Sequence, residues 1–136
     1  MSEEKITMLH GSGGQATGDL IRAVFAEAFD NEVLSQMEDS AVVPGSHRIA
    51  MTTDSFVVTP LSFPGGDIGR LAVCGTVNDL LMRGAAPRYL TCGFILEEGL
   101  DFSLLKQVVR SMADTAKDYG LDVKSLLTGD GILAEA

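Results

Sequence analysis

The chain has 136 residues, of which 46% are hydrophobic and 21% charged, a composition typical of one globular domain. Its formal net charge of -9 argues against a nucleic-acid partner, because binding the phosphate backbone needs a surplus of lysine and arginine. The sequence shows neither an apolar run of the roughly 20 residues that a membrane span needs nor a signal peptide, so we expect a cytoplasmic protein without a membrane partner.

The N-terminal part of the chain begins with a Gly-rich segment, HGSGG, at residues 10–14. Apolar residues then recur at helical spacing, which predicts a helix over residues 17–29. Residues 30–46 are polar and contain a Pro-Gly turn, so we interpret them as a connection. We therefore divide the chain into residues 1–46, with the loop, helix and connection, and residues 47–136, an α/β domain.

Two strands and a helix are predicted next. Apolar residues alternate over residues 48–53, and a second, β-branched run covers residues 56–59. A helix follows, with Asp67 at its N-cap, and it extends to about Arg83. Gly84 is placed to close this helix.

The remainder of the domain is predicted to contain two more strands around a helix. Residues 89–96 form an apolar run typical of a buried strand, and residues 123–127 form the last strand. Between them, an apolar stripe at helical spacing starts after Asp101, which can cap the helix, and Gly120 ends it. The order α, β, β, α, β, α, β predicts an α/β (α+β) fold, a mixed sheet covered by helices.

Polar residues at the ends of these elements are candidates for a nucleotide site. The loop residues Gly11, Ser12, Gly13 and Gly14 would let backbone N–H groups converge on an anion beside a helix N-terminus. The alternative is a flexible Gly-rich turn. From the sequence alone both interpretations stay open.

Carboxylates in two of the predicted elements strengthen the case for a phosphate ligand. Asp54 ends a strand, where α/β sheets usually present ligand-binding groups, although a turn-forming aspartate is the alternative. Asn78 and Asp79 interrupt an apolar helix that also contains Gly75 and Thr76. This set indicates that a ligand or another backbone approaches the helix closely, and a solvent-facing polar stripe is the alternative.

A third aspartate, Asp130, lies just past the last predicted strand in the sequence Thr-Gly-Asp, where a simple turn is again the alternative. Three aspartates at element ends, together with a Gly-rich loop, are consistent with a site for Mg²⁺ and a polyphosphate such as ATP. The sequence contains neither a Walker A motif nor a Rossmann fingerprint. Cys74 and Cys92 lie in apolar segments without metal-ligand spacing and are expected to be core residues.

Taken together, these motifs resemble the HypE family of hydrogenase expression/formation proteins. That family belongs to the superfamily of aminoimidazole ribonucleotide synthetase, selenophosphate synthetase and thiamine-monophosphate kinase. The resemblance covers nearly the whole chain and rests on HGSGG at 10–14, TTDSFVV at 52–58, PLSFPGGDIGRLAVCGTVNDLL at 60–81, GAAPRYL at 84–90, GFILEEG at 93–99 and TGD at 128–130.

The resemblance implies a function and a site. Family members use ATP to dehydrate a carboxamide on their own C-terminal cysteine to a thiocyanate, the source of the cyanide ligands of the [NiFe]-hydrogenase iron. By resemblance, Asp54, Asp79 and Asp130 would hold Mg²⁺ and the Gly-rich loop would cover the phosphates. Three further residues of the predicted helix, Gly75, Thr76 and Asn78, would line the nucleotide.

The resemblance also implies partners. Two copies would pair their sheets into a β-barrel, and a hydrogenase maturation carbamoyltransferase and the iron-scaffold maturation complex would bind the full-length protein. The family's second domain, its C-terminal cysteine and the lysine that follows Thr-Gly-Asp have no counterpart in this sequence. We therefore expect an N-terminal half that is inactive alone. The alternatives are a non-catalytic dimerisation or binding module and another ATP-using enzyme of the superfamily.

Overall fold

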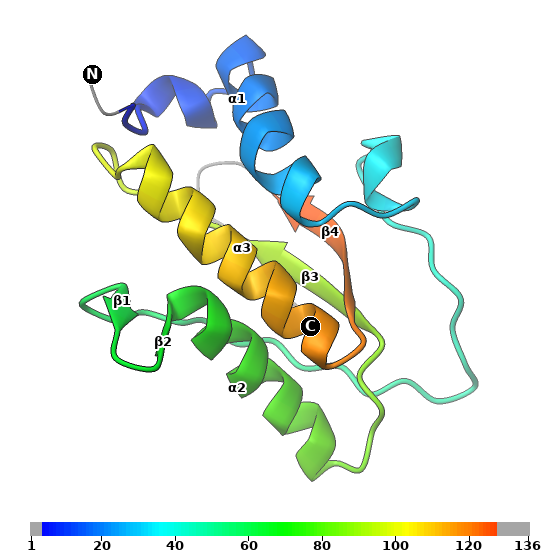
Figure 1. The fold of residues 1–136 in the computed structure, drawn as a ribbon. Helices are drawn as coiled ribbons and strands as arrows, with labels where there is room; N and C mark the ends of the chain where they lie inside the picture. Colours follow the sequence, from blue (N-terminus) through cyan, green and yellow to red (C-terminus); the bar gives the residue numbers. More distant parts are fainter. Residues whose placement is uncertain (1–3, 128–136) are drawn as a thin grey trace.

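The structure, a computed structural model, describes residues 4–127, and residues 4–121 with their side chains. The elements in chain order are η1 (Met8–Gly11), α1 (Gln15–Leu20), η2 (Ile21–Ala26), η3 (Leu34–Gln36), β1 (Ser62–Phe63), β2 (Gly66–Asp67), α2 (Ile68–Met82), β3 (Tyr89–Gly93), α3 (Phe102–Asp118) and β4 (Asp122–Leu127). Helices α2 and α3 pack side by side in front of β3 and β4, and α1 with η2 lies on the other side of α3 (Figure 1). The predicted α/β (α+β) fold, with helices covering a sheet, is confirmed, and among the described residues the sheet that they cover is the small one of β3 and β4 (Figure 1).

The central sheet consists of β3 and β4, which pair in parallel with an irregularity between Leu90 and Thr91. Burial alternates along β3, as expected for a strand with one face on the core. Strands β1 and β2 form a separate antiparallel hairpin immediately before α2. Gly65 occupies the turn with φ of 94°, a conformation that L residues with a side chain rarely adopt.

The predicted ends of the two long helices are largely confirmed. The Asp67 carboxylate accepts a hydrogen bond of 3.0 Å from the backbone N–H of Arg70, which caps α2. Gly84 and Gly120 follow α2 and α3 with φ of 68°, the left-handed conformation that ends many helices. The predicted N-terminal helix is also present, as α1 continued by the π-helical η2.

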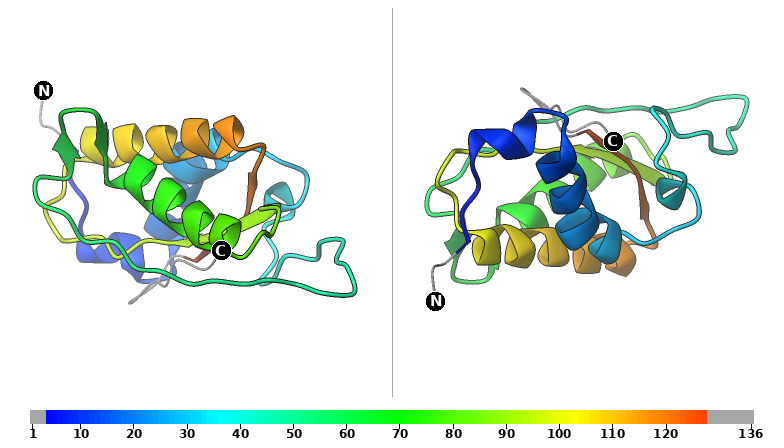
Figure 2. Two further views of the ribbon diagram at one scale, coloured as in Figure 1. Left: turned by 90° about the horizontal axis from the view of Figure 1, so that it is seen from below. Right: turned by 90° about the horizontal axis from the view of Figure 1, so that it is seen from above.

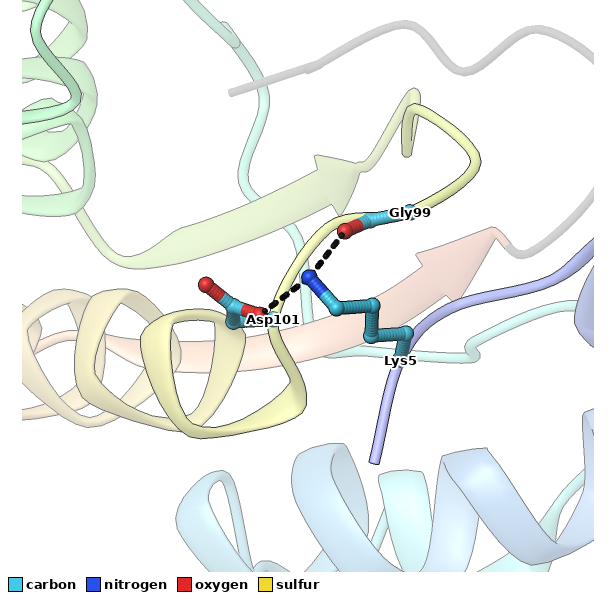
Figure 3. A network of polar contacts seen from close by, with 3 residues as sticks. All are labelled: Lys5, Gly99 and Asp101. Atoms are coloured by element: carbon cyan, nitrogen blue, oxygen red, sulfur yellow. Dashed lines mark hydrogen bonds and ion pairs between the residues drawn. The ribbon is translucent and has the colours of Figure 1, made fainter. Parts of the chain in front are cut away.

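Asp101 precedes α3 as predicted, but its side chain makes no capping hydrogen bond. Its carboxylate instead accepts a hydrogen bond of 2.9 Å from Nζ of Lys5, which also lies 3.5 Å from the carbonyl oxygen of Gly99 (Figure 3). Backbone hydrogen bonds join Ile6 to Gly99 and Leu100 at the same place. The N-terminal segment is thereby held against the start of α3.

Among the described residues, one hydrophobic core joins the N-terminal helix to the rest of the fold. Its most deeply buried side chains come from η2, α2 and α3, namely Phe25, Val73, Val77 and Val109. The stripe predicted for α3 faces this core. Among residues 4–127, no helix combines the length and the apolar character that crossing a membrane requires.

The two strands predicted over residues 48–53 and 56–59 are wrong for the described part of the chain. These residues are extended, and Thr53 takes part in an isolated β-bridge, but they form no strand with any of residues 4–127. Figure 2 shows the segment running along the outside of the molecule and beneath α2. A strand needs a neighbouring strand for its backbone hydrogen bonds, and the alternating sequence cannot supply that neighbour by itself.

Candidate nucleotide and metal site

Residues 49–58, which precede β1 and are called the extended segment below, contact α2 at two points. Oγ1 of Thr52 donates a hydrogen bond of 3.3 Å to the carboxylate of Asp79. The ring of Phe56 lies against Gly75, one helical turn before Asp79. The segment therefore runs antiparallel to α2. Asp54 lies between the two residues, Thr52 and Phe56, that contact the helix.

Alternating burial shows which side chains of this segment face the helix. Thr52, Asp54 and Phe56 are half-buried, whereas their neighbours Thr53 and Ser55 are exposed. In an extended chain, residues two apart point to the same side. Asp54 therefore points to the same side as the two residues that contact α2, which is the side of the helix.

The two carboxylates have no cationic partner in the part of the chain that the structure describes, where the ion pairs are Lys5–Asp101 and Arg22–Asp19. Asp54 accepts a hydrogen bond of 2.8 Å from the backbone N–H of Ser55. Carboxylate and hydroxyl oxygens are hard donors, and Mg²⁺ in nucleotide sites typically takes one or two carboxylates together with phosphate oxygens and water. The donor set of Thr52, Asp54 and Asp79 therefore fits a magnesium ion that a nucleotide helps to hold.

No group of three or more His, Cys, Asp or Glu side chains suited to a metal occurs among the described residues. A metal that bound to protein side chains alone would therefore lack ligands here. The arrangement favours a cation that arrives with its polyphosphate. Asp130, the third predicted carboxylate, lies outside the described residues.

The remaining predicted residues of α2 have different surroundings. Asn78 and Asp79 are exposed on the helix surface. Thr76 is buried, with 4% of its surface exposed, and Gly75 is covered by the Phe56 ring. Of the residues predicted on α2, therefore, Asn78 and Asp79 present side chains to solvent, where a ligand could reach them.

The Gly-rich loop lies on the opposite side of α3 from α2 (Figure 1), and no described hydrogen bond or ion pair links it to Asp54 or Asp79. The loop is held by its own contacts. The N–H of Gly13 donates to Oγ1 of Thr17 at 3.0 Å, and Oγ of Ser12 donates to the carbonyl oxygen of Leu9 at 2.9 Å. Within one chain, the structure thus does not bring the loop and the two carboxylates together.

Thr52 and Phe56 were not among the predicted site residues, although a signal for them is present. They stand two residues before and two residues after Asp54, so the alternation of the segment places all three on one side. The sequence does not reveal that this side meets α2. That contact joins residues 19 to 27 positions apart, and only the tertiary structure fixes it.

Residues 37–130 match a known family, the AIR synthase related protein, N-terminal domain. The chain belongs to this family. It is also 53% identical over 131 residues to the carbamoyl dehydratase HypE of Escherichia coli, which confirms the resemblance inferred from the motifs. The match covers 92% of this chain and 38% of that relative, so the chain spans about two fifths of the length of the relatives it matches.

The chain is also similar to solved structures of HypE proteins. Hydrogenase maturation protein HypE in complex with ATP is 45% identical, with a TM-score of 0.86 over 94% of this chain and 40% of that one. HypE in a HypE–HypF complex is 51% identical, with a TM-score of 0.57 over 85% of this chain and 40% of that one. The fold described above is therefore the fold of the N-terminal part of these HypE proteins.

Proposed function

We propose that this chain supplies the Mg·ATP-binding and dimerising half of a [NiFe]-hydrogenase maturation factor. The full-length protein would carry out the ATP-dependent dehydration of an enzyme-bound S-carboxamide to a thiocyanate. In this proposal, residues 47–136 form the nucleotide-binding domain and residues 1–46 add the Gly-rich loop. The protein acts in the cytoplasm, and this chain does not turn over ATP alone.

One observation carries the proposal. Asp79 accepts a hydrogen bond from Thr52, which stands two residues before Asp54, and neither aspartate has a cationic partner among the described residues, in a fold that matches a HypE structure containing ATP. Two carboxylates held at neighbouring positions repel each other unless a cation lies between them. This cation would be Mg²⁺, held by Asp54 and Asp79, with Asp130 as a further ligand.

The proposed reaction explains why a γ-phosphoryl group is needed. An amide oxygen is a poor leaving group, so that oxygen first attacks the γ-phosphorus of ATP and ADP leaves. The carbon–oxygen bond then breaks and phosphate departs, while the nitrogen loses its two protons and the thiocyanate forms. The side chains of Asp54, Asp79 and Asn78 would orient the triphosphate for the first step by fixing its position on α2.

The proposal assigns the Gly-rich loop to the phosphates, with Gly11, Ser12, Gly13 and Gly14 as their cover. The N–H of Gly13 is already bonded to Thr17, so the loop must rearrange to use that donor. Because the loop and α2 lie on opposite sides of α3 (Figure 1), either a movement of the loop or the loop of a second chain would complete the site.

We further propose a homodimer formed through the outward side of the extended segment. Its apolar residues Ile49, Met51 and Val57 are exposed, and contiguous exposed apolar surface typically marks an interface. The full-length protein would bind the maturation carbamoyltransferase and the iron-scaffold complex. The solved complex of a related HypE with HypF supports a partner of this kind.

The test is a calorimetric titration of the chain with Mg·ATP. We expect saturable binding, and we expect Asp79→Asn to weaken it by about tenfold or more, because one charge directed at the metal is lost. Asp30→Asn removes the same charge from an exposed residue far along the chain and should leave the affinity unchanged. Equal affinities for the two variants would contradict the role of Asp79, and no binding to the unsubstituted chain would contradict a site built by this half alone.

A further inference from the structure

We propose that Phe56 and Gly75 are positioning residues of the metal site, an inference that rests on the proposed function above. The Phe56 ring, seated on the bare backbone of Gly75, holds the extended segment on α2. Asp54 is thereby held facing the helix beside Asp79. Neither residue touches the nucleotide in this proposal.

The contact requires glycine because of space and not because of backbone conformation. A Cβ atom built on Gly75 would lie 2.7 Å from both Cε1 and Cζ of Phe56, closer than real Cβ contacts come. Gly75 is not among the residues with positive φ, so an alanine would suit its helical backbone. A glycine within a helix lowers its stability by about 1 kcal/mol relative to alanine. The contact with the Phe56 ring, which needs the space above Gly75, explains why a glycine is present there.

Side-chain contacts fix the position of the extended segment on α2. No strand among residues 4–127 pairs with the segment, and Thr53, whose exposed side chain points away from the helix, takes part in a β-bridge. The hydrogen bond between Thr52 and Asp79 is 3.3 Å long and exposed to solvent, which makes it a weak attachment by itself. The apolar contact of Phe56 on Gly75 is the second attachment.

The positions of the two attachments explain their effect on Asp54. One lies two residues before Asp54 and the other lies two residues after it, and all three side chains point to the same side. Fixing both ends of a five-residue extended stretch leaves its central side chain little freedom. The carboxylate of Asp54 is then preorganised toward Asp79, which is what a metal site needs from the residues around it.

The experiment compares Gly75→Ala, Phe56→Ala and the double variant with the unsubstituted chain. Calorimetry gives the affinity for ATP with and without Mg²⁺, and NMR gives the nuclear Overhauser contacts between residues 52–54 and α2. We expect each single variant to weaken Mg·ATP binding by roughly 10- to 100-fold, to leave metal-free ATP binding unchanged and to lose these contacts. A merely structural role would not change the metal-dependent part selectively.

The double variant tests whether the two residues act through one contact. Without the Phe56 ring, the methyl group that Gly75→Ala introduces has nothing to displace, so the double variant should bind Mg·ATP as tightly as Phe56→Ala. Additive losses would overturn the inference. The matched control is Gly18→Ala in α1, a helical glycine whose Cβ would meet only the flexible side chain of Arg22 and not the extended segment, and its affinity for Mg·ATP should be unchanged.

The outcomes separate this inference from the proposed function. If the unsubstituted chain does not bind Mg·ATP, the proposed function fails, while loss of the contacts between residues 52–54 and α2 in Gly75→Ala still supports the role of Phe56 and Gly75 in holding Asp54 on α2. If these contacts are the same in Gly75→Ala and the unsubstituted chain, the inference is overturned, even when the nucleotide binds.

Discussion

At the scale of single residues, Cys74 and Cys92 show how burial separates two identical side chains. Cys92 is 4% exposed, its Sγ lies 3.2 Å from Sδ of Met112, and burial raises the pKa of its thiol from 9.0 to about 12. Cys74 is only half-buried on α2, and the hydroxyl of Tyr119 lies 3.7 Å from its Sγ. The prediction of a small core residue is confirmed for Cys92 and wrong for Cys74, which lies outside the core cluster.

This difference predicts selective thiol chemistry. At pH 8 we expect a thiol-specific reagent to modify Cys74 readily and Cys92 only after unfolding, because the reactive thiolate of Cys92 is suppressed and covered. The measurement is the time course of thiol modification in native buffer and in denaturant. Cys74→Ser should remove the fast native phase, and rapid reaction of both thiols in the native protein would contradict the burial of Cys92.

At the scale of secondary-structure elements, helix α2 is shaped by two glycines that serve different neighbours. Gly75 receives the Phe56 ring, whereas Gly69 lies against α3, where an added Cβ would overlap the carbonyl oxygen of Val108 and lie 3.2 Å from the backbone nitrogen of Met112. Backbone atoms cannot swing aside as the end of a long side chain can. The packing of α2 on α3 therefore depends on Gly69.

Opposite effects are expected for alanine at two helical glycines. Gly69→Ala should lower the free energy of unfolding by about 1–3 kcal/mol, because α2 and α3 must move apart. Gly18→Ala in α1 should raise it by up to about 1 kcal/mol, since its Cβ would meet only the flexible side chain of Arg22, at 3.4 Å. Urea denaturation of both variants measures the two changes, and a neutral Gly69→Ala would show that the helices can be spaced differently.

At the scale of the whole molecule, the extended segment has two different sides. Thr52, Asp54 and Phe56 face α2, while Met51 and Val57 point outward and are 82% and 95% exposed. Large apolar side chains are unfavourable when they contact water, and the association of two chains would bury them. The proposed dimer and the proposed metal site thus use opposite sides of the same short segment.

Association should therefore depend on the outward side. We expect the unsubstituted chain to sediment as a dimer and Val57→Asp to sediment as a monomer, because the dimer would bury an unpaired charge. Sedimentation velocity over a range of concentrations measures this. Met8→Asp places the same charge on an exposed apolar residue of η1 and should leave the dimer intact; equal loss of association in both variants would contradict the proposed interface.

Much of the secondary structure follows from local sequence signals and could therefore be predicted from the sequence. The cap at Asp67 and the left-handed glycines Gly84 and Gly120 depend on a few neighbouring residues, so the ends of α2 and α3 could be predicted. Asp101 shows the limit of such signals. Its carboxylate binds Lys5, which is 96 residues away along the chain, and a local pattern cannot reveal that competing partner.

The sequence by itself determined which residues are candidates for chemistry, because the Gly-rich loop, Asp54 and the Asn78–Asp79 pair are unusual in their local settings. It also determined the alternation that puts Thr52, Asp54 and Phe56 on one side. Only the tertiary structure decided what that side faces. Contacts between distant segments depend on how whole elements pack, so the seat of Phe56 on Gly75, and with it the position of Asp54 on α2, is a property of the folded chain.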